Sequence, residues 1–308
     1  MDILLQLVLL ILGFAMLGKG ADWFVEGAAG IASRFGISEL VIGLTIVAMG
    51  TSAPEAAVSI AASFSGSAGI TVGNIVGSNI MNILVILGIT ALVKPLPIEK
   101  PTLKIELPFV IFITVLLYIF GRDGVLTLTD GAIFLCLFIG YLLRLYVNAK
   151  ETLPLEEDEF HGNTLLHDLS WTLAGGSLIL FGSNVTVDAA VAIAKFLGLS
   201  DRIIGLTIVA LGTSLPELFT SVTAAYKGNV NIAIGNIVGS NLFNILFVVG
   251  VSSVLIPIPF DKAFLIDMYW CIAAAILLFI LALPKGRLER WGGGLMLAAY
   301  AGYLYMIW

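Results

Sequence analysis

The chain has 308 residues, of which 59% are hydrophobic and 12% are charged. A typical soluble domain carries about 25% charged residues, so this composition excludes a soluble globular protein. The mean hydropathy of +1.06 predicts a protein that crosses the cell membrane several times. The net charge of −6 lies mostly in short segments, and no basic tract suits nucleic acid.

Apolar stretches separated by short polar segments predict ten transmembrane helices in an all-α membrane protein. The N-terminal residues MDILLQLVLLILGF lack a basic n-region, which predicts a first membrane helix rather than a cleaved signal peptide. The predicted helices, in chain order, are 3–28, 40–63, 72–93, 104–120, 128–148, 168–196, 203–226, 233–255, 264–283 and 290–307.

The chain contains an internal duplication. Residues 41–60 match residues 203–222 at 13 of 20 positions, and residues 72–84 match 234–246 at 10 of 13, all at a constant offset of 162. Each repeat holds five predicted helices. Because five is odd, the second repeat enters the membrane from the opposite side, which predicts two inverted five-helix repeats.

The predicted division is a first repeat at 1–148, a linker at 149–167 and a second repeat at 168–308. The linker is acidic, and a weak calcium sensor is an alternative interpretation of it. It lacks the ligand spacing of an EF-hand loop and is too short for a domain, so we interpret it as a solvated linker.

Loop charges predict the orientation of the chain. Ten lysine and arginine residues fall in the segments that follow odd-numbered helices, against four in those that follow even-numbered helices. Because cytoplasmic loops are enriched in these residues, the first set is predicted to be cytoplasmic. Both termini are then outside the cell, and the acidic linker is in the cytoplasm.

Two glutamates, Glu55 and Glu217, lie at the centres of predicted helices 2 and 7, at matching repeat positions. A charged side chain at the bilayer centre costs roughly 2.5–3.5 kcal/mol on insertion scales, so such residues normally face a cavity and mark an ion or proton path. Hydrogen bonding to a neighbouring helix is the alternative role. It does not explain why the surrounding hexapeptide occurs twice.

The hexapeptides are GTSAPE (50–55) and GTSLPE (212–217). Proline has no N–H and clashes with the carbonyl four residues earlier, so Pro54 and Pro216 predict broken helices 2 and 7. Opened backbone at membrane depth is tolerated only against protein or a water-filled cavity. The breaks therefore favour an ion site at the two glutamates.

The next helix of each half begins with the motif GNIVGSN, and its polar side chains, four residues apart, form one stripe along the helix. The stripe consists of Asn74, Ser78 and Asn82 in the first half and of Asn236, Ser240 and Asn244 in the second. Hydrogen bonding between helices is the alternative role for the asparagines.

Pairing the two repeats brings a set of oxygen-bearing side chains to one centre. The candidate ligands are Glu55, Glu217, Thr51, Ser52, Thr213, Ser214, Ser78, Ser240, Asn82 and Asn244. No His or Cys takes part, which disfavours zinc, copper and iron, whereas calcium takes six to eight oxygen ligands. Two carboxylates neutralise one divalent ion, two monovalent ions or two protons, and that competition is the chemical basis of exchange.

The remaining membrane charges predict structural roles. Lys19 and Asp22 are three residues apart on the first helix, which predicts an ion pair. Asp130 and Asp267 stand at predicted helix starts, which predicts helix caps.

The paired GTSxPE and GNxxGSNxxN motifs, in inverted five-helix halves, resemble the calcium/cation antiporter superfamily and its prokaryotic sodium/calcium exchangers in particular. The resemblance covers essentially the whole chain. It implies that the first helix of each half slides against a core of the other eight. It also implies that the ions are bound by Glu55, Glu217, Thr51, Ser52, Ser78, Asn82, Thr213, Ser214 and Ser240, together with the backbone carbonyls of Ala48 and Ala210. One position departs, since several sodium/calcium exchangers carry Asp where this chain has Asn244.

The sequence and the resemblance together predict a secondary-active antiporter that exchanges calcium for sodium by alternating access. Calcium and sodium are the transported ions, no cofactor is expected, and no nucleophile–base pair suggests an enzyme. Because Asn244 leaves one ionisable group fewer, proton-coupled calcium exchange stays open, although GNIVGSN differs from the motif typical of the proton-coupled branch. A cation channel is a further alternative, disfavoured by an inverted repeat within one chain. The oligomeric state stays open.

Overall fold

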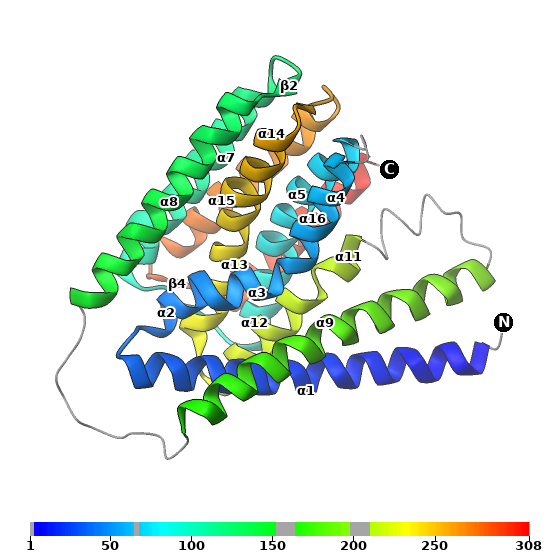
Figure 1. Cartoon of the computed structure of the whole chain (residues 1–308), viewed down its shortest axis with the longest axis vertical. Helices are drawn as coiled ribbons and strands as arrows, with labels where there is room; N and C mark the ends of the chain where they lie inside the picture. The colour runs from blue at the N-terminus through cyan, green and yellow to red at the C-terminus, as the bar shows by residue number, and fades with distance from the viewer. Residues whose placement is uncertain (1–2, 65–67, 152–163, 198–209, 308) are drawn as a thin grey trace.

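The computed structural model describes residues 3–64, 68–151, 164–197 and 210–307, which form helices and two-residue strands (Figure 1). The first half contains α1 (Ile3–Phe35), α2 (Glu39–Ile42), η1 (Gly43–Val47), α3 (Ala48–Thr51), α4 (Ala53–Phe64), α5 (Ala68–Met81), η2 (Asn82–Leu87), α6 (Gly88–Val93), β1 (Leu96–Pro97), η3 (Thr102–Glu106), α7 (Leu107–Gly121), β2 (Val125–Leu126) and α8 (Leu128–Glu151). The second half contains α9 (Leu165–Phe196), α11 (Ala210–Thr213), α12 (Leu215–Lys227), α13 (Val230–Phe243), η5 (Asn244–Val249), α14 (Gly250–Leu255), β3 (Ile258–Pro259), α15 (Phe264–Ala282), β4 (Arg287–Leu288) and α16 (Arg290–Ile307).

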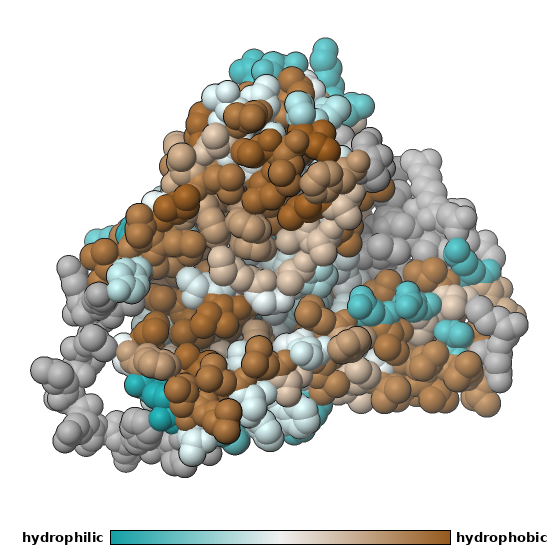
Figure 2. Space-filling model, in the orientation of Figure 1, coloured by the Kyte–Doolittle hydropathy of each residue, from teal (hydrophilic) through white to brown (hydrophobic). Residues whose placement is uncertain are grey.

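The described part is an all-α, multi-pass membrane protein. Seven of its helices are long and apolar enough to cross a membrane, and the bent pair Glu39–Thr51 and Ala53–Phe64 makes an eighth span. The segments α11–α12 and α16, which correspond to predicted helices 7 and 10, do not meet that criterion within the described residues. Ten spans therefore remain a prediction. Figure 2 shows hydrophobic side chains over most of one face, as expected of a surface in contact with lipid.

Two helical segments form the centre of the molecule. In the apolar stretch of the α5–α6 segment 78% of the residues are buried, and in that of the α13–α14 segment 94% are. In the apolar stretches of α7, α8 and α15 the share is 33% or less. Buried polar residues also concentrate on these two segments and on the broken helices beside them. The candidate ligands therefore lie at the core of the bundle.

The long helices α1 and α9 lie against each other along one side of the core (Figure 1). A Cβ atom on Gly175 would approach the backbone nitrogen of Phe24 and would lie 2.7 Å from the carbonyl oxygen of Gly20. No side chain fits there, so glycine is what permits the close helix crossing. The predicted range of helix 1 was too short, because α1 runs on to Phe35.

Each half contains a helix interrupted at a serine. Ser52 (φ −84°, ψ 7°) separates α3 from α4, and Ser214 (φ −92°, ψ 5°) separates α11 from α12. The first interruption bends the helix by 50°. Pro54 and Pro216 each occupy the second residue of the new helix, where a missing N–H is tolerated. The chain therefore opens two residues before the proline in each half.

In each half, the membrane segment after the broken helix contains a π-helical stretch. In the first half η2 begins at Asn82, and in the second half η5 begins at Asn244. Such stretches are frequent at functional sites because the extra residue per turn changes the direction of side chains. The sequence patterns that predict the helices did not reveal them.

Two short antiparallel ladders join the halves, and no pattern in the sequence predicts them. β1 pairs with β4, and β2 pairs with β3. β1 precedes α7 and β2 follows it, so the two ladders lie at opposite ends of α7. Two-residue strands are too short to produce an alternating pattern in the sequence.

The predictions for charged residues outside the centre of the bundle are confirmed in part. Lys19 and Asp22 form the predicted ion pair at 3.2 Å. Asp130 accepts hydrogen bonds from the backbone N–H and hydroxyl of Thr127 at the start of α8, as predicted for a capping residue. The prediction for Asp267 was wrong, because its carboxylate accepts a 2.9 Å hydrogen bond from the hydroxyl of Tyr303 on α16 and forms no cap.

Candidate cation-binding site

Glu55 on α4 and Glu217 on α12 lie in the core and are almost completely buried. Each carboxylate is bonded by the serine at the break of the other half. Ser52 Oγ donates a 2.7 Å hydrogen bond to Glu217 Oε1, and Ser214 Oγ donates a 3.4 Å hydrogen bond to Glu55 Oε1. The two halves therefore build one site, with the broken helices facing each other.

Five buried side-chain oxygen atoms of the predicted ligands have no hydrogen-bond partner among the described residues. They are Glu55 Oε2, Glu217 Oε2, Asn82 Oδ1, Asn244 Oδ1 and Ser240 Oγ. A buried polar atom without a partner costs about 1–3 kcal/mol, so five of them on predicted ligands call for an explanation. All five are atoms that a hard cation binds, and all five belong to predicted ligands.

The hydroxyl groups nearest the breaks already donate their hydrogen atoms to the protein. Thr51 Oγ1 donates to Asn236 Oδ1 at 2.9 Å, while Ser52 and Ser214 donate to the glutamates. A hydroxyl oxygen that donates its hydrogen keeps its lone pairs as acceptors. These three oxygens are therefore suited to bind a cation as well.

Asn74 and Asn236 brace the backbone of the two glutamates. Asn236 Nδ2 donates to Ser221 Oγ at 2.9 Å and to the carbonyl oxygen of Glu217 at 3.4 Å. Asn74 Nδ2 makes the matching bonds to Ser59 Oγ at 3.0 Å and to the Glu55 carbonyl at 3.3 Å. This end of each predicted stripe therefore supports the site from α5 and α13, as the interhelical alternative predicted.

Two asparagines outside the predicted ligand set, Asn79 and Asn241, hold the amides of the predicted ligands. Asn82 Nδ2 donates to Asn241 Oδ1 at 3.0 Å, and Asn244 Nδ2 donates to Asn79 Oδ1 at 3.1 Å. Both asparagines belong to the duplicated GNIVGSN motif, which was the available signal. The four-residue spacing that defines the stripe excluded them.

The other predicted ligands differ in burial and in the contacts that their atoms make. Ser78 is buried on α5, and Thr213 is partly buried at the end of α11. The Ala48 carbonyl accepts a hydrogen bond from the backbone N–H of Ser52 at 3.0 Å, and it lies 3.3 Å from Thr51 Oγ1, whose shorter hydrogen bond goes to Asn236. Ala210 is the first residue of α11. The carbonyl ligands remain predictions.

Within the described ranges, no protein cation balances the charge of the two glutamates. No lysine or arginine of the described residues forms an ion pair with either glutamate, whereas Glu106 at the start of α7 pairs with Arg144 at 3.0 Å. The described residues also contain no group of three or more His, Cys, Asp or Glu side chains placed to hold a metal ion. Two carboxylates among neutral oxygens suit calcium or sodium better than a transition metal.

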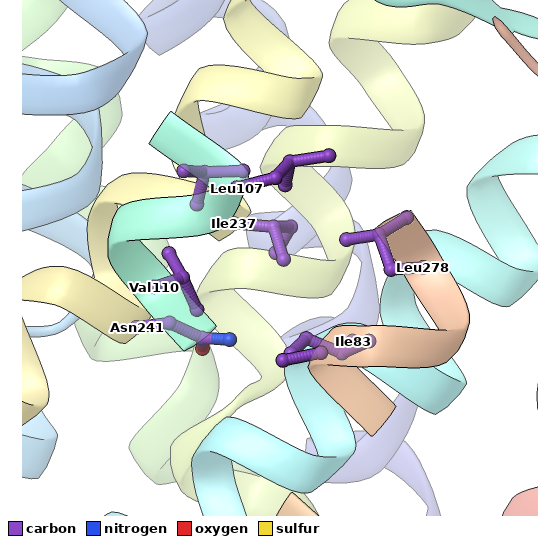
Figure 3. A pocket seen from close by; sticks show the side chains of 8 residues that line it. Ile83, Leu107, Val110, Ile237, Asn241 and Leu278 are labelled. Carbon is purple, nitrogen blue, oxygen red and sulfur yellow. The ribbon is translucent and has the colours of Figure 1, made fainter. Parts of the chain in front are cut away.

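A small cavity lies between η2, α7, α13 and α15, and Asn241 is one of its lining residues (Figure 3). Its lining is apolar apart from Asn241, and includes Ile83, Leu107, Ile237 and Leu278. No carboxylate lines it, so it is distinct from the candidate cation site.

An all-α membrane bundle with a buried, oxygen-lined pair of carboxylates defines a membrane transport protein for hard cations. The sequence profile described as "Sodium/calcium exchanger protein" matches residues 5–147 and again residues 167–308. The chain therefore belongs to the sodium/calcium exchanger protein family.

Individual relatives agree with this assignment. The chain is 41% identical to CaxA of Alkalimonas amylolytica over 99% of each chain. It is 33% identical to the sodium/calcium exchanger MaX1 of Methanosarcina acetivorans, again over 99% of each. Among solved structures, the sodium–calcium exchanger NCX_Mj, soaked with zero Na⁺ and Ca²⁺, superimposes with a TM-score of 0.88 at 33% identity and 100% coverage of both chains.

Proposed function

We propose that this chain is a secondary-active antiporter that exchanges calcium for sodium across the cell membrane. The observation that carries the proposal is the pair of buried carboxylates, each bonded by the serine of the opposite half and each retaining an unpaired oxygen. Two negative charges bind one calcium ion or two sodium ions, so the two cations compete for the same oxygens. Family membership supports transport rather than catalysis.

The proposed ligands comprise two carboxylates, neutral side-chain oxygens and two carbonyls. They are Glu55, Glu217, Thr51, Ser52, Ser78, Asn82, Thr213, Ser214, Ser240, Asn244 and the carbonyl groups of Ala48 and Ala210. The unpaired oxygens support the two glutamates, the two asparagines and Ser240 most directly. No resident cofactor forms part of the proposal, because the ions are the cargo.

We further propose ten helices in two inverted repeats, predicted at 1–148 and 168–308, joined by a linker predicted at 149–167, of which residues 152–163 lie outside the described ranges and both ends belong to α8 and α9. The family profile supports this division because it matches once in each half. The ladders support the inversion. β2 and β4 occupy matching positions of the repeat, yet they belong to ladders at opposite ends of α7, as expected when one repeat is turned over relative to the other.

Alternating access would involve α1 and α9, the first helix of each half. They lie against each other through glycine, and α1 contacts the core at α12, where Lys227 forms ion pairs with Asp22 at 2.5 Å and Glu26 at 3.7 Å. The charge asymmetry of the loops supports termini outside the cell and a cytoplasmic linker.

The test uses purified protein in calcium-loaded vesicles with the pH clamped. An external sodium jump is expected to release calcium. In a second experiment without the clamp, calcium release that follows an imposed pH gradient and does not respond to sodium would instead identify a proton-coupled exchanger. Currents of single-channel size would identify a channel and contradict alternating access.

A further inference from the structure

Asn79 on α5 and Asn241 on α13 occupy matching positions in the two halves and are buried. We propose that they are positioning residues, each fixing the amide of the ligand asparagine in the other half so that its Oδ1 faces the cation. The inference rests on the proposed function, because it concerns how the same site presents its oxygens.

The orientation of Asn244 follows from a chain of hydrogen bonds that begins at the main chain. Asn79 Nδ2 donates to the backbone carbonyl of Asn241 at 3.4 Å. A carbonyl only accepts, so this bond determines which end of the Asn79 amide faces it. Asn79 Oδ1 therefore points the other way, where it accepts the 3.1 Å hydrogen bond from Asn244 Nδ2. That leaves Asn244 Oδ1 as the unpaired oxygen.

The other half repeats the arrangement. Asn241 Nδ2 donates to the backbone carbonyl of Asn79 at 3.4 Å, and Asn241 Oδ1 accepts a 3.0 Å hydrogen bond from Asn82 Nδ2. Asn82 Oδ1 is then the unpaired oxygen. Turning either ligand amide over would bring two amide oxygens together and would offer an NH₂ group to the cation. Hard cations bind oxygen, so the network selects the binding orientation.

The surroundings favour this arrangement. Asn241 is the one polar residue among those lining the apolar cavity, so no other lining residue offers its amide a competing hydrogen bond (Figure 3). The ligands Asn82 and Asn244 stand at the first residues of η2 and η5, where the helices change pitch. Partners that orient metal-binding side chains typically contribute 10–100-fold to metal affinity.

The geometry predicts a specific pattern of coupling. Asn79 acts on Asn244, which is 165 residues away, and not on Asn82, which is three residues away on the same segment. Calcium binding to the full-length purified protein, titrated with calcium chloride in sodium-free buffer, measures this coupling in double-mutant cycles.

We expect Asn79→Ala to weaken calcium binding by about 10–100-fold. Adding Asn79→Ala to Asn244→Ala is expected to cause no further loss beyond about twofold, whereas adding it to Asn82→Ala is expected to multiply the two losses. If the losses also multiply with Asn244→Ala, Asn79 does not act through Asn244 and the inference is overturned. It is equally overturned if Asn79→Ala leaves calcium affinity unchanged.

The mirror cycle tests the same inference if Asn79→Ala does not fold. Asn241→Ala is expected to couple to Asn82→Ala and to combine independently with Asn244→Ala. The variants Asn79→Ser and Asn241→Ser keep a small polar side chain and repeat both cycles, with the same expected and contradicting results. If the unaltered protein binds no calcium, the proposed function fails before any variant is compared.

Discussion

Ser52 and Glu217 are joined by a 2.7 Å hydrogen bond although 165 residues separate them in the chain. The serine stands at the break of one helix, and the glutamate lies just beyond the break of the other. The counterpart bond, from Ser214 to Glu55, is longer at 3.4 Å. Each half therefore supplies a donor to the carboxylate of the other half, and neither repeat holds the complete site alone.

Neutralising either glutamate is expected to abolish calcium transport. Glu55→Gln and Glu217→Gln keep the size of the side chain but remove half of the negative charge that balances a divalent ion. Expression is expected to survive, because removing a buried charge does not destabilise the fold through desolvation. Calcium flux in vesicles measures the effect, and Glu289→Gln, in the loop between α15 and α16, serves as the control. Near-normal flux in either glutamate variant would remove that residue from the site.

The two serines at the breaks are expected to differ in importance. Ser52→Ala removes the shorter hydrogen bond to a carboxylate and one candidate ligand oxygen, so calcium affinity should fall by about 10-fold or more. Ser214→Ala removes the longer bond and should cost less. Calcium titration of both variants gives the comparison, with Ser170→Ala on α9 as the control. A larger loss for Ser214→Ala would contradict the geometric ranking.

Asn244→Asp is expected to change the sodium-to-calcium selectivity or the charge moved per cycle, because it adds a third ionisable group to the site. An aspartate oxygen cannot donate to Asn79 Oδ1, which lies 3.1 Å from Asn244 Nδ2, unless the new carboxyl is protonated. Reversal potentials of vesicle currents at varied sodium and calcium give both quantities. If neither changes, the difference between Asn and Asp at this position is silent.

Lys227 is expected to favour the state in which α1 contacts α12. Its ion pairs with Asp22 and Glu26 have no equivalent in the other half, because the position matching Lys227 is Ser65. Partly exposed ion pairs contribute about 0.2–1 kcal/mol each, so losing both in Lys227→Gln should shift the balance by about 30-fold at most, and less at high salt.

Spin-label distances between α1 and α12 measure that shift. Lys19→Gln is the control, because Lys19 pairs with Asp22 within α1 itself. An unchanged distance distribution for Lys227→Gln at low salt would show that these ion pairs do not affect the conformational balance.

Adding a methyl group at the close contact between α1 and α9 is expected to destabilise the protein. Gly175→Ala would place a Cβ against the backbone of Phe24 and Gly20, and overpacking of this kind costs about 1–3 kcal/mol. Gly18→Ala on α1 is the matched control, since a Cβ there meets no atom within 4 Å. The thermal unfolding midpoint of each variant, monitored by gel filtration after heating, measures the effect. Equal midpoints for the two variants would contradict the close crossing.

The two glutamates of the candidate site could be singled out from the sequence because the motif around them occurs twice. Glu55 and Glu217 are charges in apolar segments, and the offset of 162 relates one to the other and each neighbouring hydroxyl to its counterpart. The unpaired oxygens of Asn82, Asn244 and Ser240 belong to the same predicted set. Repetition of a costly residue pattern is a strong signal in a membrane protein.

Features that depend on contacts between the halves were not predictable in this way. Asn79 and Asn241 lie outside the four-residue stripe because their partners are on the other half. The two antiparallel ladders were not predicted, because strands of two residues show no alternating pattern in the sequence. Asp267 looked like a cap from its position in the chain, but its partner, Tyr303, comes from α16. Each miss involves a residue whose partner is distant in the sequence.

Anomalous diffraction from crystals soaked first in calcium at low sodium and then in high sodium is the decisive measurement for a shared calcium and sodium site. We expect a calcium peak between Glu55 and Glu217, within about 2.3–2.6 Å of oxygens from both halves, that disappears when sodium is raised. A calcium peak outside this centre, or one that persists unchanged in high sodium, would contradict competition of the two ions at the paired glutamates.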